Sequence, residues 1–380
     1  MKSAASTSIR AVSNGLTVQS AGWLELTNSG PCAQPFFQPE WFEAYTSAFE
    51  PAAKPYVVSV SDPSGRVNGV LPLTKSSSFF GRFPARTLRS LSNIHSCRFN
   101  LIHRESDRTE VVQQTWRSLV TDRWWDVIEV FDVPTLSAFE DLAELAKADG
   151  YLIGRWPTRR SPYVPLPSDK ADPFANCPQA FKGTRHRLKA KQRKLEAELG
   201  PMELKLTTIA NQAELEKFYK LEASGWKGEN GSAIACDSKR VDFYTRIAQG
   251  AASRGYLSLY SLTFGTTLVA MHFGLEMSGV YYTPKVAYDE RHKKHSPGLL
   301  LVHHVLVDLV RRGLQELDFL GPQMEWKRVW ATHEREHANW YIFRPSVKGR
   351  LAHALTMKVA PLARRLKHRA FGDPQGPTSD

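Results

Sequence analysis

The stretch from Val280 to Trp330 constrains the fold more than any other part of the chain. It begins with an aromatic and β-branched run, Val280–Ala287, which predicts a buried strand. A charged loop, Asp289–His295, follows. The apolar positions of Leu299–Arg312 recur at helical spacing and predict a helix that ends at a glycine. Because Leu314–Leu320 predicts another strand, the order of strand, loop, helix and strand indicates an α/β unit.

The junction Ser296-Pro297-Gly298 predicts an anion-binding helix start. Serine is a preferred N-cap residue, and proline suits the first helical position because its missing N–H would be unpaired there. Gly298 allows a ligand to approach the backbone closely. Free N–H groups and the positive end of the helix dipole attract anions. We therefore expect a diphosphate here; the alternative is an ordinary strand-to-helix turn preceded by solvated cations, namely Arg291, Lys293 and Lys294.

Three motifs carry a resemblance to a known family. They are Leu221–Gly228 with Gly231–Ile234, Ala287–Glu290 with Ser296–Leu300, and Leu317–Gly321 with Trp326, Lys327 and Trp330. Together they resemble the acyl-CoA-binding core of the GNAT acyltransferase superfamily, and most closely its CelD-type branch, which is related to the Fem aminoacyl-transferases. The resemblance covers residues 180–345. It implies an α/β (α+β) fold of tandem GNAT-like domains, with mixed, mostly antiparallel sheets flanked by helices.

One motif departs from the family pattern. The usual GNAT phosphate loop, R/Q-x-x-G-x-G/A, has several glycines, whereas here only Gly298 remains and Pro297 removes a donor. The resemblance implies acetyl-CoA or another acyl-CoA as co-substrate, no metal, and a small-molecule or saccharide acceptor such as a polysaccharide precursor. The departure leaves open whether the acyl carrier is CoA, another thioester or an aminoacyl-tRNA.

Candidate site residues follow from their positions on these elements. Asp318 ends a strand beside the cofactor helix and is the candidate base or substrate clamp; alternatively it caps the following turn. Lys327 follows a glycine turn and would hold an anionic group of the acceptor, while Tyr282 and Tyr288 would supply a hydroxyl as acid. The substrate-binding candidates are Trp226, Lys227 and His272. The cofactor-binding candidates are Arg291, Lys294, Ser296, Gly298 and Leu299.

Composition and charge limit the other possibilities. The 380 residues carry a net charge of +12, which favours anionic partners without choosing among them. No apolar run approaches the roughly 20 residues that span a bilayer. Four separated cysteines without a CxxC motif indicate reduced thiols in a cytoplasmic protein. The basic tail Ser346–Phe371 has leucines at helical spacing, so we expect it to pack on the body or to contact an anionic membrane, peripherally to the inner membrane.

The sequence predicts five segments: a disordered N-terminus (1–20), an N-terminal GNAT-like domain (21–165), a Pro-rich linker (166–180), the acyltransferase domain (181–345) and the basic tail (346–380). Six prolines in Pro157–Pro178 predict that no strand or helix crosses that stretch. A short strand is expected at the start of Gly22–Glu50, and another at Arg98–Ile102. A β-hairpin is expected at Tyr56–Leu73 around Asp62–Gly65.

Two further functional hypotheses remain open at the sequence level. The basic segment Lys182–Lys194 favours an aminoacyl-tRNA-dependent Fem-type transferase, although a solvated helix face is the simpler interpretation. Charge and aromatic content also allow a non-catalytic nucleic-acid- or membrane-binding protein. The motif His333-Glu334-Arg335-Glu336-His337 matches H-E-x-x-H formally. We reject a zinc site because its surroundings are charged and strand-like residues follow directly, and no nucleophile elbow or P-loop is present.

Overall fold

The computed structural model describes residues 10–12, 20–80, 83–168, 172–178 and 181–359. Its strands form one continuous 13-stranded sheet in the order β1-β2-β3-β4-β6-β13-β7-β12-β11-β10-β9-β8, with β5 (Ile102–His103) pairing with β3 beside this path. Most strand pairs are antiparallel; the pairs β4·β6 and β11·β12 are parallel. The expected fold class, a mixed and mostly antiparallel α/β architecture, is confirmed, and the sheets of the two halves are joined edge to edge.

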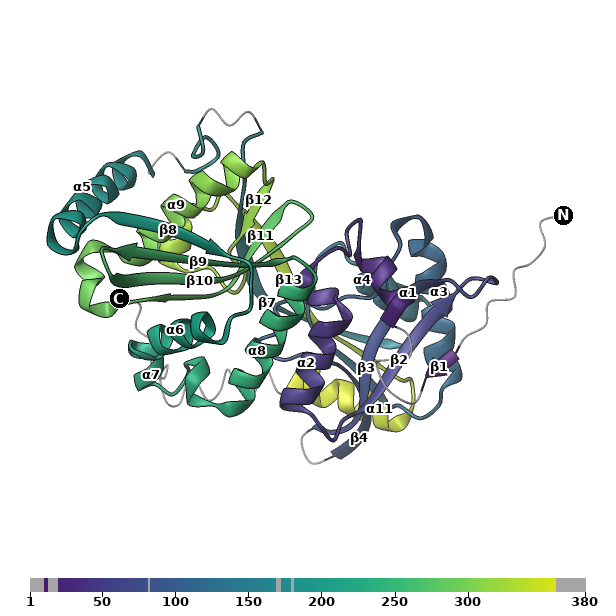
Figure 1. Cartoon of the computed structure of the whole chain (residues 1–380). Helices are drawn as coiled ribbons and strands as arrows, with labels where there is room; N and C mark the ends of the chain where they lie inside the picture. The colour runs from purple at the N-terminus through teal and green to yellow at the C-terminus, as the bar shows by residue number, and fades with distance from the viewer. Residues whose placement is uncertain (1–9, 13–19, 81–82, 169–171, 179–180, 360–380) are drawn as a thin grey trace.

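The two halves repeat the same order of elements (Figure 1). In the N-terminal half these are β1 (Arg10–Val12), α1 (Ser20–Thr27), α2 (Pro39–Phe49), β2 (Lys54–Ser61), β3 (Val67–Phe80), β4 (Phe83–Ser90), α3 (Arg108–Thr121), β6 (Val127–Pro134), α4 (Ala138–Ala148) and β7 (Leu152–Pro165). In the C-terminal half they are β8 (Met202–Thr207), α6 (Gln212–Ala223), α8 (Ser238–Ser253), β9 (Leu257–Phe264), β10 (Thr267–Met277), β11 (Val280–Tyr288), α9 (Pro297–Arg312), β12 (Glu316–Asp318), α10 (Glu325–Arg328) and β13 (His333–Phe343). The repeat supports a tandem arrangement.

Each half places its last strand in the sheet of the other half. Strand β7 pairs with β12, and strand β13 pairs with β6. The two exchanged strands also pair with each other over eleven positions, from His333 with Tyr163 to Phe343 with Leu152. These pairings make the sheet continuous through the middle of the molecule.

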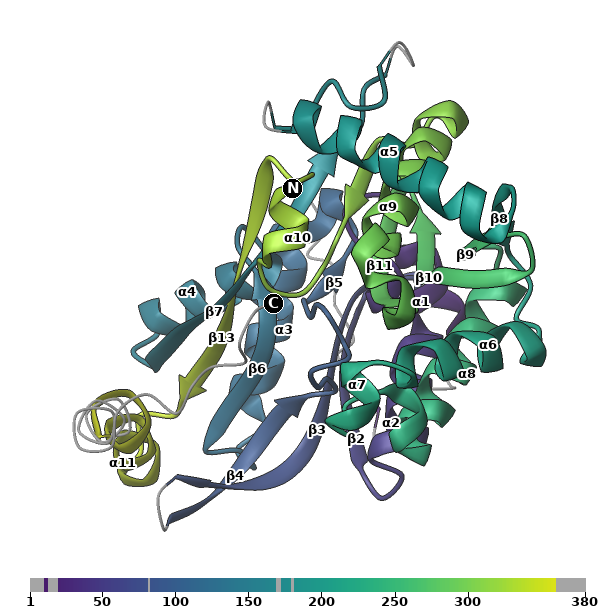
Figure 2. The same cartoon turned by 90° about the vertical axis from the view of Figure 1, so that its left-hand side faces the viewer.

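Helices cover both faces of the sheet (Figures 1 and 2). Helix α9 and the basic helix α5 (Phe181–Leu199) lie on one face of the C-terminal half, and α6, α7 (Trp226–Glu229) and α8 lie on the other. Helices α2 and α8 pack against each other through Trp41 and Phe243, whose ring centroids are 5.5 Å apart and perpendicular. The Arg254–Glu40 ion pair borders this contact. Buried side chains of both halves belong to one apolar core.

The structure corrects three local expectations. Residues 22–27 belong to helix α1 rather than to a short strand, and Arg98–Ile102 is mostly loop, with only Ile102 entering β5. Strand β7 runs through Pro157 and Pro162, although we expected the prolines to exclude a strand. Proline is tolerated where its nitrogen faces away from a ladder. Strand β7 is paired on both sides only at Tyr163, and its register with β13 shifts next to Pro157.

Both ends of the chain are only partly described. Strand β1 lies within the first 20 residues, where we expected disorder; the remaining residues before Ser20 lie outside the described part. The expected C-terminal helix is α11 (Val347–Ala354), which continues as a π-helical turn, η6 (Leu355–Val359). Ala352 of α11 packs with Phe80 and Phe343, so this part of the tail packs on the body. Residues 360–380 lie outside the description. Among the described residues, no helix has the length and apolar character needed to cross a bilayer.

Candidate acyl-transfer site

The site is organised by a fork between strands β11 and β12. The two strands pair only from Val280 with Glu316 to Tyr282 with Asp318. Strand β11 then continues to Tyr288, paired with β10 on one side. Thr283 lies at the point of divergence, where its Oγ1 donates to the Asp318 carbonyl oxygen at 3.5 Å. The fork therefore leaves one backbone edge of β11 without a strand partner beyond Thr283, within the described residues.

A β-bulge lies at the same place. Phe273 of β10 pairs with Lys285, and Leu275 pairs with Tyr282, so two steps on β10 oppose three on β11. The extra residue changes the alternation of side chains along β11. Tyr282 and Lys285 consequently lie on the same face of the sheet, the face covered by α2 and α8.

The far end of the open edge meets the start of helix α9. Gly298 lies against the Tyr288 ring, because a Cβ added there would be 3.5 Å from Tyr288 Cδ1. Ser296 is the N-cap residue, but its side chain makes no capping hydrogen bond, which differs from the expectation. Its backbone is left-handed (φ 53°, ψ 54°), and its Oγ accepts a hydrogen bond of 2.7 Å from Lys191 Nζ of α5. Helix α5 therefore supplies a cation at this junction that the sequence did not reveal.

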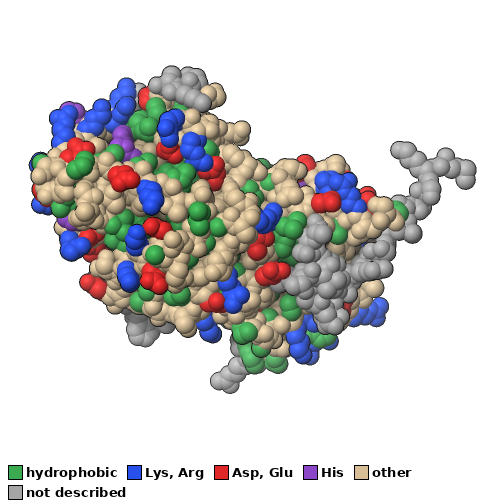
Figure 3. All heavy atoms as spheres, viewed as in Figure 1, with side chains coloured by type: hydrophobic (Ala, Val, Ile, Leu, Met, Phe, Trp, Pro, Cys, Tyr) green, Lys and Arg blue, Asp and Glu red, His purple; other side chains and the backbone are tan. Residues whose placement is uncertain are grey.

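The other predicted cofactor residues surround this junction. Arg291 is exposed and binds Asp289 through its backbone and its guanidinium. The Lys294 ammonium lies 3.5 Å from Glu198 of α5. Leu299 is half-buried in the core under α9. Figure 3 shows Lys and Arg side chains gathered over α5. A pocket of about 390 Å³ opens beside the same loop, and its lining includes the cations Lys217, Lys220 and Arg291 and the carboxylates Asp289 and Glu290. Cations therefore gather around the helix start, with Arg291 and Lys294 paired to acidic residues.

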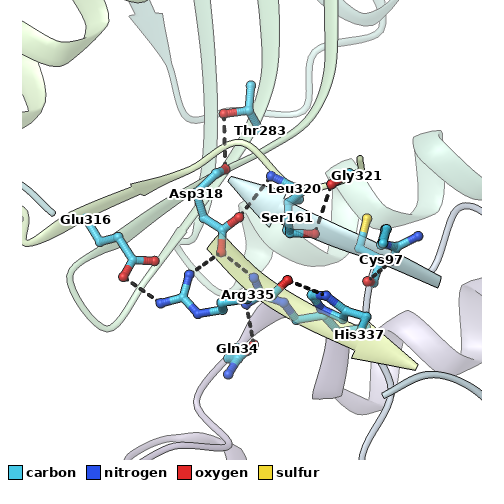
Figure 4. Close-up of polar contacts among 12 residues, drawn as sticks. Gln34, Cys97, Ser161, Thr283, Glu316, Asp318, Leu320, Gly321, Arg335 and His337 are labelled. Atoms are coloured by element: carbon cyan, nitrogen blue, oxygen red, sulfur yellow. Dashed lines mark hydrogen bonds and ion pairs between the residues drawn. The ribbon is translucent and has the colours of Figure 1, made fainter. Parts of the chain in front are cut away.

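Asp318 lies at the centre of a buried ion cluster (Figure 4). Its carboxylate accepts hydrogen bonds from Arg98 and, at 2.8 Å, from Arg335 Nη1, while its Oδ1 accepts from the Leu320 N–H at 2.9 Å. Its side chain is 0% exposed and that of Arg98 is 4% exposed. Arg335 also binds Glu316 at 2.6 Å. The carboxylate therefore joins the N-terminal half, β12 and β13, and it caps the turn after β12 as the alternative interpretation expected.

Lys327 is buried beside this cluster. Its Nζ donates to the carbonyl oxygens of Leu320 at 2.6 Å and Pro322 at 2.9 Å. Burial lowers its pKa to about 8, an effect that the Asp318 carboxylate partly offsets. An ammonium held by two carbonyls fixes the loop after β12. Its proposed contact with the acceptor stays a prediction.

The remaining predicted residues occupy different places. Tyr282 is buried under the Arg98 guanidinium, and burial raises its pKa. Burial also raises the pKa of Tyr288.

The Trp226 side chain is 47% exposed, so it is not a core residue. Lys227 binds Glu222 at 3.1 Å and the Val286 carbonyl oxygen at 2.8 Å, on the open edge of β11. His272 is buried, and burial lowers its pKa to about 3. Asp318, Lys327, Tyr282 and Lys227 therefore lie around the fork, whereas His272 lies within the sheet core.

A second group at the fork was missed by the sequence analysis. The Lys285 ammonium lies 5.5 Å from the ring centroid of Tyr244, and the Tyr244 hydroxyl is 3.2 Å from His95 Nδ1. Burial lowers the pKa of His95 to about 4, helped by the charges of Lys285 and Arg240. Burial lowers the pKa of Lys285, which Glu222 partly offsets. The Cys97 backbone, which binds Arg159, closes this side of the fork.

The H-E-x-x-H motif does not form the helical arrangement of a zinc protease, because His333–His337 belongs to strand β13. Within the residues that the structure describes, no group of three or more His, Cys, Asp or Glu side chains could hold a metal ion. His337 is buried, with its Nδ1 at 3.0 Å from the Arg335 carbonyl oxygen.

Comparison with known proteins agrees with this geometry. Residues 182–328 match the family model described as an acetyltransferase (GNAT) domain. FemX has a similar structure, with a TM-score of 0.56 and 10% identity over 86% of this chain and 96% of that one. The C-terminal DUF2156 domain of a putative lysylphosphatidylglycerol synthetase from Agrobacterium fabrum gives 0.54 and 9% identity over 91% and 97%. A protein of unknown function from Bacteroides thetaiotaomicron gives 0.54 and 8% over 89% and 100%. No curated protein matches the sequence. Residues 182–328 thus match a GNAT-fold acetyltransferase domain, and the fold of the whole chain is similar to that of FemX.

Proposed function

We propose that this chain is an acyl-CoA-dependent N- or O-acyltransferase whose thioester lies at the β11–β12 fork. The observation that carries the proposal is the open edge of β11, which leads from the cationic start of α9 to the fork. Tyr288 lies five positions beyond Thr283, so this edge is about 16 Å long. That length is comparable with an extended pantetheine arm. A diphosphate at Gly298 would therefore place its thioester between Thr283 and Lys285.

The proposed reaction is direct attack on the thioester. An amine or hydroxyl of the acceptor forms a bond to the acyl carbon, the carbon–sulfur bond breaks, and the CoA sulfur leaves with the electron pair. The acceptor gives up one proton, and the thiolate takes up one. A backbone N–H group on the open edge of β11, such as that of Val286, would stabilise the developing oxyanion, since Pro284 has none. Since the fork holds both reactants in place, positioning supplies much of the rate. In this mechanism Asp318 and Lys327 fix the shape of the fork.

The acceptor would enter from the face of α2 and α8, where Lys285, Tyr244 and His95 border the fork. We propose a saccharide amine or hydroxyl as the acceptor, in line with the branch that the sequence resembles. His95 lies within reach of this space, and burial keeps its imidazole neutral at neutral pH. A neutral imidazole is able to accept the acceptor's proton.

The direct test is calorimetric titration of the full chain with CoA and acetyl-CoA. We expect binding, and we expect Gly298→Val to weaken it at least tenfold, because the added methyl groups would cover the N–H groups at the start of α9. Gly183→Val, at an exposed position of α5, is the matched control and should bind as the wild type does. A wild-type chain that binds neither compound at saturating concentration would remove the main support for the proposal.

An aminoacyl-tRNA-dependent transferase is the second candidate. It is favoured by the basic surface of α5 beside the helix start and by the likeness to FemX and to a domain of a putative lysylphosphatidylglycerol synthetase. Activity that disappears after ribonuclease treatment would support it. A third candidate is a non-catalytic nucleic-acid- or membrane-binding protein. Binding of RNA or DNA with a steep salt dependence, together with no CoA binding, would support the nucleic-acid form.

A further inference from the structure

Lys285 occupies a distinctive position at the fork. It lies three residues beyond Tyr282, the last residue of β11 that pairs with β12. The bulge turns its side chain to the face of α8, where the ammonium lies over the Tyr244 ring at 5.5 Å. Under the proposed function, this is where the thioester of the donor ends.

The other cations around the fork are held by specific partners. Lys227 is held by Glu222 and the Val286 carbonyl oxygen, and Lys327 by two carbonyl oxygens. Arg98 and Arg335 share the Asp318 carboxylate. Lys285 makes no hydrogen bond or ion pair with any residue in the described ranges, and its side chain is half-buried. Only the π-face of Tyr244 contacts its charge, so this amine is free to react.

We propose that Lys285 is an acylation site of the protein itself, modified by the donor bound in the same chain when no acceptor occupies the fork. The neutral amine of Lys285 attacks the thioester carbon, a C–N bond forms, and the C–S bond breaks. The CoA sulfur takes the electron pair, and the proton lost by the amine passes through solvent to the thiolate. The products are an amide on Lys285 and free CoA, so no further reactant is needed.

Burial lowers the pKa of Lys285, which raises the fraction of reactive amine at neutral pH. The amide product carries no charge and is larger than the amine. It would fill the space between Tyr244 and the fork and would block the acceptor. The modification would therefore limit turnover when donor is abundant and acceptor is scarce.

The inference depends on the proposed function, since it requires a donor bound at the fork. Its test is incubation of the purified full chain with acetyl-CoA, followed by intact-mass measurement and peptide mapping. We expect one acetyl group per chain, located on Lys285. Lys285→Arg should abolish it, and Lys147→Arg, at a lysine of α4 whose side chain is 65% exposed, should leave it unchanged. An excess of free CoA should suppress acetylation of Lys285 at least tenfold.

Other outcomes would overturn the inference in distinguishable ways. Acetyl groups spread over exposed lysines, and unaffected by free CoA, would show ordinary chemical acylation. Acetylation of Lys327 instead would place the thioester on the other side of the fork. Bound acetyl-CoA by calorimetry without acetylated Lys285 would refute this inference and leave the proposed function intact. No bound acetyl-CoA would refute both.

Discussion

Replacing Asp318 by asparagine tests whether its carboxylate holds the two halves together. Asp318→Asn keeps the shape of the side chain and removes the charge that Arg98 and Arg335 share. Removing one partner of a buried ion pair costs about 3–5 kcal/mol, because the other charge stays buried. Arg98 has no other carboxylate among the described residues, whereas Arg335 is 31% exposed and keeps Glu316. We therefore expect a loss near the lower end, about 3 kcal/mol of unfolding free energy.

Urea denaturation, followed by tryptophan fluorescence and by far-UV circular dichroism, measures this loss. The two probes should give one midpoint if the halves unfold together. Glu325→Gln is the matched control, since its pair with Arg328 is exposed on both sides and should contribute no more than about 0.5 kcal/mol. Arg98→Met combined with Asp318→Leu should lose less than the sum of the single changes. A loss below about 1 kcal/mol for Asp318→Asn, with acyl transfer abolished, would refute the structural role and favour a catalytic one.

Three further predictions concern charge. Lys327 has a pKa of about 8 in the folded chain, below its ordinary value, so the unfolded chain holds this proton to higher pH. As pH rises from 8 to about 10, the free energy of unfolding of the wild type should therefore increase relative to that of Lys327→Met, by at most about 1.4 kcal/mol per pH unit. A difference in urea midpoint between the two proteins that stays constant over this range would contradict the prediction. Three buried histidines have pKa values near 3 in the folded chain: His272, His303 and His337. As pH falls below about 6.5, each should lower the free energy of unfolding by up to about 1.4 kcal/mol per pH unit, because the unfolded chain binds the proton first. A urea midpoint that is unchanged between about pH 7 and 5 would contradict this prediction. Lys191→Met should weaken CoA binding about threefold to tenfold and flatten its salt dependence in calorimetry, while Lys189→Met should not, and equal affinities would place the diphosphate elsewhere.

Much of the C-terminal half could be predicted from sequence because its signals are local. The apolar periodicity of α9, the strands β9 to β11 with the tight turns between them, and the glycine after Arg312 each specify an element within a few residues. The exchange of β7 and β13 is different, because strand pairing depends on contacts between residues far apart in the chain. The prolines in β7 led us to predict a linker. Proline disrupts a strand only where the ladder needs its backbone N–H as a donor, and the sequence does not show on which side of the strand a partner lies.

The site shows the same division. Asp318 and Lys327 were predicted from their positions at the end of β12 and after a glycine turn, and the structure places both beside the fork, where their roles stay predictions. Arg98 comes from the other half, so no spacing within residues 181–345 could indicate it. Lys285 was missed because simple alternation along β11 places it opposite Tyr282. The bulge reverses that assignment, and Pro284 was the one local signal for it.

The exchanged strands also affect how the sheet folds while the chain is being synthesised. Strand β6 is complete by residue 134, yet its partner β13 begins at His333, near the end of the described chain. Until the ribosome has produced that segment, the central edge of β6 has no partner and is open to pairing with other chains. The sheet of the N-terminal half therefore stays incomplete, with one strand edge unpaired, until β13 of the C-terminal half has been synthesised.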